Sequence, residues 1–562
     1  MDQGPVTKAV PAASRGEREA GWKLAPEIAA QTQGLVVSGF GHLTKGRALL
    51  LFIGPDPDPA NHPGAWMQTL DRVAPVTPAT PPADLAAPDA GQAAALAFTW
   101  SGLRQMQLYE TALQSFAGPF REGMMQEDRL RRLGDRRKGE WLDTVIAGGP
   151  VWSANVPQPA STARPAGAYD VSRFHEETAF GTGDTVHAVL LLYARDDGAA
   201  TRLAQDVTVA LARHQVSVVR QLDLTLDVED TGVSNEHFGF ADGLSQPAPY
   251  DKNGAVLRNG LPVTVPDPVQ GVPLGEILLG HVNGHKEVPP GPVVPDDDKR
   301  KVGRPATAGL VPHPDAEGFF DFGLNGSYLV VRELRQDVAA FWQSMDANAA
   351  AIHARDPDNS AHVTPDWLAA RVVGRDRNGH LLCPVTHNRP DGLLALAADG
   401  LPHSGYLFRA DDPDGLGCPK GSHVRRANPR DALAPSPAQG PTLLQAANNH
   451  RILRRARKYG PKIADDRVDD SGQPGRDRGL LFMCLNTDIA RQFEFVQTTW
   501  LLNASFATLH EEVDPLVGPD GPMTIPEDPL RRRIHVATFV QMVGGDYFFL
   551  PSLPALRYLA LP

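Results

Sequence analysis

The chain has 562 residues, 42% of them hydrophobic, and a formal net charge of -12. A chain of this size can bury a large core, and its length predicts two or more domains. The acidic balance argues against nucleic acid as a partner, because binding to phosphates needs concentrated positive charge.

The cysteines and the first residues of the chain indicate the cellular compartment in which the protein resides. Cys383, Cys418 and Cys484 show no Cys-x-x-Cys spacing, so the sequence supports neither a disulfide framework nor a structural zinc site. Residues 1–25 contain no apolar run typical of a signal peptide and no twin-arginine pair. No segment approaches about 18 uninterrupted apolar residues. We therefore expect a flexible tail over residues 1–25, a cytoplasmic protein and no membrane partner.

The N-terminal half begins with two apolar runs bounded by glycine, at residues 34–38 and 48–53, which predict a hairpin. The glycines between them do not form a phosphate-binding loop, because a strand follows Gly46 and the Gly-Lys-Ser/Thr ending is absent. The later elements expected in this half are helices up to Trp152, a buried strand over residues 185–193, an amphipathic helix around residues 199–214 and a strand over residues 217–221.

In the C-terminal half, residues 286–316 are rich in Pro, Asp and Lys, and we expect an exposed insertion there without regular structure. The elements expected after it are a strand over residues 326–332, a helix from Gln336, strands over residues 479–484 and 535–542, and a hairpin into residues 547–550. This pattern suits an α+β chain in which antiparallel sheets carry helices.

Three segments carry candidate chemistry. Residues 235–247 (NEHFGFADGLSQP) place Asp242 between Gly239 and Gly243, where the backbone can approach a ligand closely, although an ordinary turn gives the same pattern. Residues 422–430 (SHVRRANPR) supply an imidazole at His423, and residues 451–460 (RILRRARKYG) supply a cluster of cations. That cluster is either a solvated helix face or a set of buried cations that meets an anionic ligand.

An acid, an imidazole and an arginine in this order resemble the dye-decolorizing peroxidases (DyP-type), a family of haem peroxidases whose Gly-x-x-Asp-Gly loop falls on residues 239–243. Further matches lie at residues 478–484, 492–497, 514–518 and 544–552, and a looser likeness begins at about Ala30. The resemblance implies an α+β fold of two ferredoxin-like domains, which we place at residues 26–225 and 226–562. It also implies one haem b per chain, held mainly by the C-terminal domain.

The family pattern makes His423 the axial ligand of the haem iron, and a neutral imidazole is a common ligand for that position. Of Arg425, Arg426 and Arg430, at least one should reach a haem propionate, because guanidinium groups suit carboxylates, and Arg425 and Arg430 fit the family pattern best. On the opposite face, Asp242 would be the base that moves the peroxide proton. Arg454 would stabilise the negative charge on the departing oxygen.

Two further groups complete the expected site. The family's distal wall falls on Leu480 and Phe482, whose side chains would keep the peroxide pocket small and dry, although both also read as ordinary core. A carboxylate commonly accepts the other ring N–H of an iron-bound histidine. Glu512 and Asp514 are the first candidates for this acceptor and Glu494 is a third, and an exposed acidic turn accounts for residues 510–514 equally well.

The resemblance implies a haem peroxidase that reduces hydrogen peroxide through a ferryl intermediate and oxidises dyes, phenolic compounds or other small one-electron donors. A carboxylate base has an ordinary pKa of roughly 4, so dye oxidation should be favoured at acidic pH. Two alternatives remain: a haem-binding carrier or sensor without turnover, and a haem-processing, deferrochelatase-like enzyme. A peroxide-splitting pair of Asp242 and Arg454 argues against both. The sequence does not predict the oligomeric state or the physiological donor.

Overall fold

The computed structural model describes most of the chain, in segments separated by gaps, of which residues 136–185 are the longest. The described residues are 24–56, 62–79, 91–124, 126–135, 186–227, 234–250, 257–258, 261–262, 269–296, 304–383, 406–468, 470, 476–527, 529 and 531–561.

One large antiparallel sheet organises these residues. Its strand order is β11-β17-β2-β3-β1-β4-β13-β14-β12, and β11 also pairs with β14, so that eight of the nine strands close into a ring. The strands are β1 (Lys45–Ile53), β2 (Gln92–Phe98), β3 (Ala188–Ala194), β4 (Val216–Thr225), β11 (Ser327–Gln336), β12 (Leu453–Arg454), β13 (Arg457–Tyr459), β14 (Gly479–Asn486) and β17 (Val540–Leu550).

The ring has two halves that meet at narrow seams. The first half is β1 to β4, and the second is β11 to β14 with β17. One seam is the single residue pair Phe98 with Phe549, and the other joins β4 to β13 over two residue pairs. This is the α+β arrangement expected of two ferredoxin-like units. The predicted boundary after residue 225 coincides with the end of β4, and nearly all of the predicted tail lies outside the described residues.

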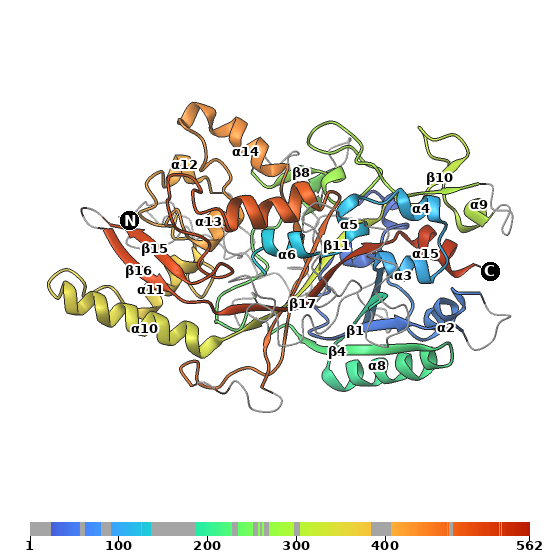
Figure 1. Cartoon of the computed structure of the whole chain (residues 1–562), viewed down its shortest axis with the longest axis horizontal. Helices are drawn as coiled ribbons and strands as arrows, with labels where there is room; N and C mark the ends of the chain where they lie inside the picture. The colour runs from blue at the N-terminus through green and yellow to red at the C-terminus, as the bar shows by residue number, and fades with distance from the viewer. Residues whose placement is uncertain are drawn as a thin grey trace, which may run out of the picture.

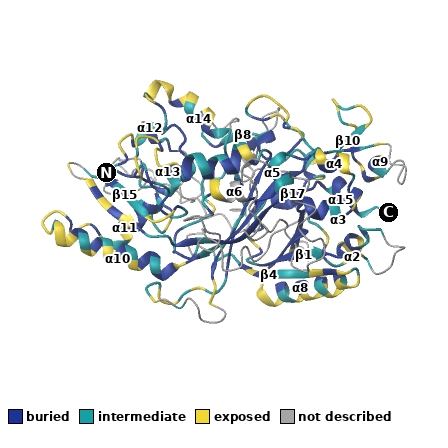
Figure 2. Ribbon diagram, viewed as in Figure 1, coloured by how far each residue is buried: buried dark blue, intermediate teal, exposed yellow. Residues whose placement is uncertain are grey.

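Side chains alternate between the inside and the outside of the ring. In β1, Ala48 and Leu50 belong to the cluster inside the ring, whereas Leu49 and Leu51 belong to the cluster under the outer helices. Helices α2 (Ala65–Val73) and α8 (Asp197–Ala212) cover this outer face beside β1 and β4 (Figure 1). In Figure 2, α8 is exposed on its outer side, whereas β1, against which it packs, is buried along most of its length. Two layers of apolar packing therefore hold each strand.

A separate core lies at the other end of the molecule. It is formed by α10 (Val338–Arg355), α11 (Pro365–Val373), β15 (Gly521–Pro526) and β16 (Arg531–Val536), which lie together at the left of Figure 1. Phe238 and Phe240, from the glycine-rich loop, pack into this core against Phe341 and Trp342 of α10. The loop that carries Asp242 is thus fixed by apolar contacts on one side.

Short elements connect these layers. The helices are α1 (Pro26–Ala29), α3 (Trp100–Gln105), α4 (Glu110–Gln114), α5 (Gly118–Glu122), α6 (Glu127–Arg132), α9 (Arg304–Ala308), α12 (Phe408–Asp411), α13 (His423–Ala427), α14 (Gly440–Asn448), α15 (Leu553–Ala560), η1 (Gly34–Val36), η3 (Leu274–Glu276), η4 (Pro437–Gln439), η5 (Ala490–Glu494) and η6 (Val496–Leu501). The short strands are β5 (Ala248–Tyr250), β6 (Leu257–Arg258), β7 (Leu261–Pro262), β8 (Gly271–Pro273), β9 (Val293–Pro295) and β10 (Phe319–Asp321).

The predicted hairpin over residues 34–53 is wrong. Residues 34–36 form the 3-10 helix η1, and β1 pairs with β3 and β4 instead. The guanidinium of Arg455 donates to the carbonyl oxygens of Leu35 and Val36, at 2.8 and 2.6 Å. These backbone acceptors are therefore satisfied without a partner strand.

Three other expectations need correction. Strand β2 was not predicted, because its alanine-rich run has low intrinsic β-propensity and is held only by its neighbours in the ring. The predicted strand over residues 535–542 is split between β16 and β17. The proline-rich segment 286–316 contains β9, which pairs with β10, and α9, in whose first turn Pro305 is tolerated. The expected strands and helices that became β3, α8, β4, β11, α10 and β14 are confirmed.

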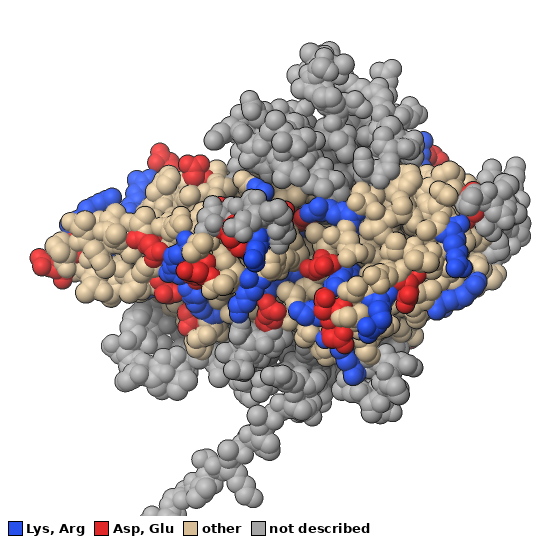
Figure 3. Space-filling view, turned by 90° about the horizontal axis from the view of Figure 1, so that it is seen from below, with Lys and Arg blue, Asp and Glu red and all other residues tan. Residues whose placement is uncertain are grey.

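Two features concern the surface. On the face seen in Figure 3, lysine and arginine are interspersed with aspartate and glutamate, and neither sign forms a continuous patch over the described residues. Among the helices that the structure describes, none has the length and apolar character to cross a membrane.

Candidate active site

His423 is the first residue of α13, and its ring is oriented by a buried acid. Its Nδ1 lies 2.9 Å from Oδ2 of Asp514, whose other oxygen accepts the backbone N–H groups of Leu516 and Val517. Burial opposes ionisation of Asp514, but the charge and hydrogen bond of His423 lower its pKa below the usual value. An ionised carboxylate can only accept, so Nδ1 carries the proton and the lone pair of the neutral ring lies on Nε2.

Nε2 of His423 is available to a ligand. It has no hydrogen-bond partner among the described residues, and 29% of the side-chain surface is accessible. Burial alone would lower the pKa of His423, but Asp514 raises it above the ordinary value. Two smaller effects oppose each other: the charge of Arg454 lowers this pKa and the charge of Asp242 raises it. The acid and the arginine predicted for the opposite face therefore lie within electrostatic reach of this imidazole.

Arg426 fixes Asp514 relative to His423. From α13 its guanidinium donates to the carbonyl oxygens of Trp500 and Glu512, at 2.8 and 2.6 Å, and the backbone N–H of Asp514 donates to Leu501 at 2.8 Å. The histidine and its acceptor are thus held by one bonded network. In the sequence, the only sign of this role is a second arginine in the histidine motif.

The other two candidate acids have different partners. The carboxylate of Glu512 accepts the backbone N–H and the hydroxyl group of Thr524, at 2.9 and 2.6 Å. Glu494 pairs with Arg129 and accepts the hydroxyl group of Tyr547. Among the described residues, Asp514 is therefore the acid that contacts His423.

Asp514→Asn should change the donor strength of this imidazole. The amide keeps the size of the carboxylate but loses its charge, so Nε2 becomes less basic. We expect cofactor affinity or activity to fall about 10- to 100-fold and the reduction potential of the bound iron to rise. Spectroelectrochemical titration measures that potential, and Glu512→Gln, two residues away, is the matched control without a shift. An unchanged potential in Asp514→Asn would refute this role.

Asp242 and Arg454 form the second part of the site. Nη1 of Arg454 lies 3.3 Å from Oδ1 of Asp242, and 31% and 26% of the two side chains remain accessible. Oδ1 of Asp242 also accepts the N–H of Gly243 at 2.6 Å, while Oδ2 has no hydrogen bond to any described residue. Gly239 and Gly243 have φ of +94° and +79°, a backbone region that L side chains rarely adopt. The glycines are therefore needed for the path of this loop.

Arg454 is held from several directions. Its Nη2 donates to the carbonyl oxygen of Leu244 at 2.5 Å, and its backbone N–H donates to the side chain of Gln246 at 3.0 Å. These bonds aim the guanidinium at the loop that carries Asp242. Gln246 lies inside the 235–247 motif, but nothing in the motif indicates this role.

Leu480 and Phe482 lie on the same face of the sheet as Arg454. Arg454 is directly opposite Cys484 in the antiparallel pair of β12 and β14, so these two side chains share a face. Side chains alternate along β14, which places Leu480 and Phe482 on that face too, and both are half-buried. Their contact with a bound ligand stays a prediction.

The remaining cations of residues 451–458 bind protein groups. The recorded bonds run from Arg451 to Ser245 and Gln270, from Arg455 to Leu35 and Val36, from Arg457 to Gly39, Phe40 and Leu43, and from Lys458 to Asp227. Several of these bonds join the two halves of the ring. The segment is therefore neither a solvated helix face nor, apart from Arg454, a set of cations around the site.

Arg425 and Arg430 differ in their free donors. Nη1 of Arg425 donates to the carbonyl oxygens of Asp412 and Cys418, both at 2.9 Å. Arg430 donates from Nη1 to the carbonyl oxygen of Tyr406 at 2.7 Å, but its Nε and Nη2 are buried without a partner among the described residues. Buried unpaired donors are costly, and a carboxylate would satisfy them. Arg430 therefore has donors that fit a propionate, and the contact of either arginine with a propionate stays a prediction.

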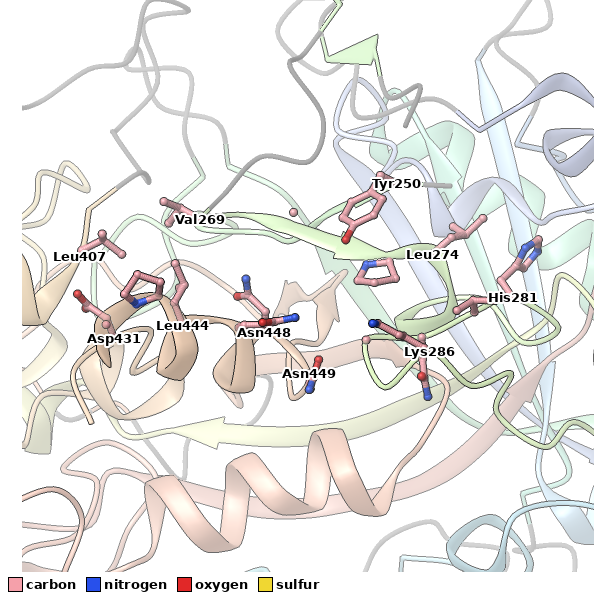
Figure 4. A pocket seen from close by; sticks show the side chains of 18 of the residues that line it. Tyr250, Val269, Leu274, His281, Lys286, Leu407, Asp431, Leu444, Asn448 and Asn449 are labelled. Carbon is pink, nitrogen blue, oxygen red and sulfur yellow. The ribbon is translucent and has the colours of Figure 1, made fainter. Parts of the chain in front are cut away.

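A cavity of about 1190 Å³ lies beside these segments. Figure 4 shows Tyr250, Leu274, Leu444 and Asn448 around it, between β8 and α14. Its lining includes Asp431, which follows Arg430, but His423, Asp242 and Arg454 do not line it. It is a neighbouring cavity and not the space between the imidazole and the acid.

Comparison with known proteins relates the chain to one group. No family model matches it. It is 29% identical over 416 residues to a dye-decolorizing peroxidase of Mycena epipterygia, an alignment that covers 67% of each chain. It is also 29% identical over 398 residues to the multifunctional dye peroxidase DyP2 of Amycolatopsis sp., which covers 67% of this chain and 71% of that protein.

Solved structures agree over a longer stretch. A DyP-type peroxidase of Anabaena sp. superposes with a TM-score of 0.64 and 22% identity, covering 95% of both chains. A dye-decolorizing peroxidase in complex with 2,6-dimethoxyphenol gives a TM-score of 0.64 and 23% identity, covering 96% of this chain and 100% of that one. Likeness at this identity establishes the fold. The chain is a homologue of the dye-decolorizing peroxidases in sequence and has the two-unit α+β, ferredoxin-like fold of these enzymes.

Proposed function

We propose that the protein is a haem peroxidase that reduces hydrogen peroxide and oxidises dyes, phenols or other small one-electron donors. The single observation that carries this proposal is the arrangement of three groups. Nε2 of His423 is available, its Nδ1 is bonded to Asp514, and Asp242 and Arg454 form an ion pair within electrostatic reach of the same imidazole. A carrier would not need the acid–arginine pair.

The residues present fit one haem b per chain. His423 would offer Nε2, which carries the lone pair when the ring is neutral, as the axial ligand, and Arg430 would offer two buried donors to a propionate. These residues, with Asp242 and Arg454, all follow residue 225, so the C-terminal unit would hold most of the cofactor. When bound, the haem would supply the redox chemistry that reduces peroxide and oxidises the donors.

Asp242 would move one proton. Its Oδ2 has no hydrogen bond to a described residue, so it can take a proton from one peroxide oxygen and deliver it to the other, which leaves as water. Arg454 would stabilise the negative charge that develops on the departing oxygen. Leu480 and Phe482 would exclude water and thereby strengthen both effects. Two electrons from two donor molecules and two protons complete the reduction of peroxide to two waters.

Dye oxidation should be favoured at acidic pH. A carboxylate with an ordinary pKa of roughly 4 keeps its base form at acidity that would protonate a histidine. Initial rates at fixed peroxide across the pH range measure this, with Asp242→Asn as the variant that lacks the base. A maximum well above neutrality would contradict the assignment of a carboxylate base.

Mixing the haem-loaded protein with peroxide separates the proposal from its rivals. A rapid spectral change that a dye then reverses supports the peroxidase. Slow bleaching without dye turnover would favour the haem-binding carrier or sensor. Analysis of the tetrapyrrole afterwards detects the haem-processing alternative, since released iron or an opened ring would replace intact haem.

A further inference from the structure

We propose that Glu236 is a positioning residue whose carboxyl group sets the place of Asp242. This inference rests on the proposed function, because it assigns Glu236 a part in the same reaction through the loop that carries the base. Glu236 stands six residues before Asp242 in the glycine-rich motif, and the sequence analysis gave it no role.

The carboxyl group of Glu236 gathers the loop around itself. Oε2 accepts the backbone N–H of Phe238 at 2.8 Å, and Oε1 accepts that of Phe240 at 2.9 Å. Oε2 also accepts the side-chain amide of Gln336, on β11, at 2.6 Å. One side chain thus binds two amides of the loop and ties it to the ring sheet.

The backbone carries this anchoring on to Asp242. The N–H of Glu236 donates to Phe240 at 2.9 Å, and residues Asn235 and Ala241 form an antiparallel bridge. The N–H of Asp242 then donates to the carbonyl oxygen of Ser234 at 2.8 Å. Moving the amide of Phe240 therefore moves the base, and a shift of about 1 Å in a reacting group can cost about 100-fold in rate.

Apolar packing fixes the loop on the side away from Asp242. Phe238 stacks on Phe341 with ring centroids 4.6 Å apart, and Nε1 of Trp342 donates to the carbonyl oxygen of Phe238 at 3.2 Å. These contacts orient the aromatic residues, but none of them holds the amide of Phe240. Glu236 supplies the bond to that amide, two residues before the base.

The charged surroundings of Glu236 are few. Burial raises the pKa of Glu236 to about 7, and the negative charge of Asp242 adds to this rise. The three hydrogen bonds that the carboxylate accepts act in the opposite direction and lower the pKa. His237 is bonded to the carbonyl oxygen of Tyr459, and burial lowers its pKa to about 4, so it is neutral near pH 7. Arg377 lies over Gly239 but is paired with Asp366. Gln336 is neutral, so no cation contacts this carboxylate among the described residues.

Glu236→Ala and Glu236→Gln test the proposal together. Alanine removes both acceptors and should lower the rate constant for reaction with peroxide about 10- to 100-fold at pH 5. Glutamine keeps one acceptor oxygen, which can hold the amide of Phe240, but its NH2 group cannot accept the N–H of Phe238. That NH2 group can instead donate to the buried Oε1 of Gln336, which has no partner among the described residues, once the Gln336 amide flips. Glu236→Gln should therefore stay within a few-fold of the natural protein at pH 5. Both variants should retain a normal haem spectrum.

Hydrogen exchange gives a readout that needs no turnover. Loss of the acceptors should speed exchange of the Phe238 and Phe240 amides about tenfold in Glu236→Ala, with or without haem. In Glu236→Gln the remaining side-chain oxygen can still protect the Phe240 amide, whereas the Phe238 amide loses its acceptor, so exchange should speed at Phe238 and not at Phe240. This comparison within a single folded variant keeps the test decisive where Glu236→Ala fails to fold.

Asp321→Ala is the matched control. Asp321 is another buried carboxylate that accepts a backbone amide, that of Leu324 at 2.8 Å, and burial raises its pKa. It lies in β10, outside the glycine-rich loop, so its loss should leave the 238–240 amides and the peroxide rate unchanged. An equal effect of Asp321→Ala, or unaltered exchange and rate in Glu236→Ala, overturns the inference. Absence of any peroxide reaction in the natural protein would instead refute the proposed function, while the exchange data would still test the anchoring.

Stability should depend on pH through the same group. Folded Glu236 keeps its proton up to about pH 7, whereas an ordinary glutamate loses it near 4.5. The folded state therefore binds more protons between these values, and the contribution of Glu236 to stability falls as pH rises through this window. Urea unfolding should show the advantage of the natural protein over Glu236→Gln shrinking from pH 4.5 to 7. A constant difference would contradict the raised pKa.

Discussion

Replacing His423 with alanine is expected to abolish peroxidase activity and to change the Soret band of the haem-loaded protein. The structure leaves Nε2 of this histidine available while Asp514 holds the other nitrogen. Loss of an outer partner such as Asp514 costs about 10- to 100-fold, and loss of the ligand itself should exceed that range. Haem titration followed by absorption spectroscopy measures both binding and ligation.

Two comparisons sharpen the test of His423. His535→Ala is a control for the loss of an imidazole, because 68% of that side chain is accessible and it lies on β16. Free imidazole added to His423→Ala should restore part of the ligand band, since it can occupy the space left by the side chain. A His423→Ala spectrum identical to that of the natural protein would dismiss His423 as the ligand.

Asp242→Asn is expected to slow the reaction with peroxide by about 100- to 10,000-fold, with haem binding unchanged. Asparagine keeps the size of the side chain and can still accept from Gly243 and Arg454, but it cannot take up a proton. Stopped-flow mixing with peroxide isolates this step from the oxidation of dyes. The expected loss should appear in the peroxide step and not in the affinity for the dye.

The partner of Asp242 supplies the cross-check. Arg454→Leu removes the charge at 3.3 Å and should cost about 100- to 1,000-fold in the same step. Because the two groups act on one molecule of peroxide, the double variant should lose less than the product of the single effects. Asp223→Asn, an exposed acid paired with Arg47, controls for the loss of a carboxylate. An Asp242→Asn protein that reacts at the natural rate would refute the assignment of the base.

Local sequence patterns predicted the elements whose burial follows their own periodicity. The run that became β3 is apolar throughout, and α8 has a clear amphipathic pattern and an N-cap at Asp196. Long-range contacts decided the failures. Residues 34–36 curl into η1 because Arg455, some 420 positions away in the chain, satisfies their carbonyl oxygens. The alanine-rich β2 is a strand because β3 pairs along its whole length.

The candidate site shows the same division. Motif resemblance selected Asp242, His423 and Arg454, and the structure brings their charges within reach of one another. The resemblance could not decide whether Glu512 or Asp514 accepts from His423, because two acids two residues apart in a loop differ only in the direction that the backbone gives their side chains. The structure turns one toward Thr524 and the other toward His423. Likewise, only the fold shows that Nη1 of Arg425 is bonded to backbone carbonyl oxygens while Nε and Nη2 of Arg430 are buried without a partner among the described residues.

A crystal structure of the haem-loaded protein at acidic pH tests the central claim most directly. It should show the iron bound to Nε2 of His423, Asp514 on the other ring nitrogen, and Asp242 and Arg454 facing the open side of the metal. A haem bound through another residue, or one that left Asp242 and Arg454 on the same side as the ligating histidine, would contradict the account.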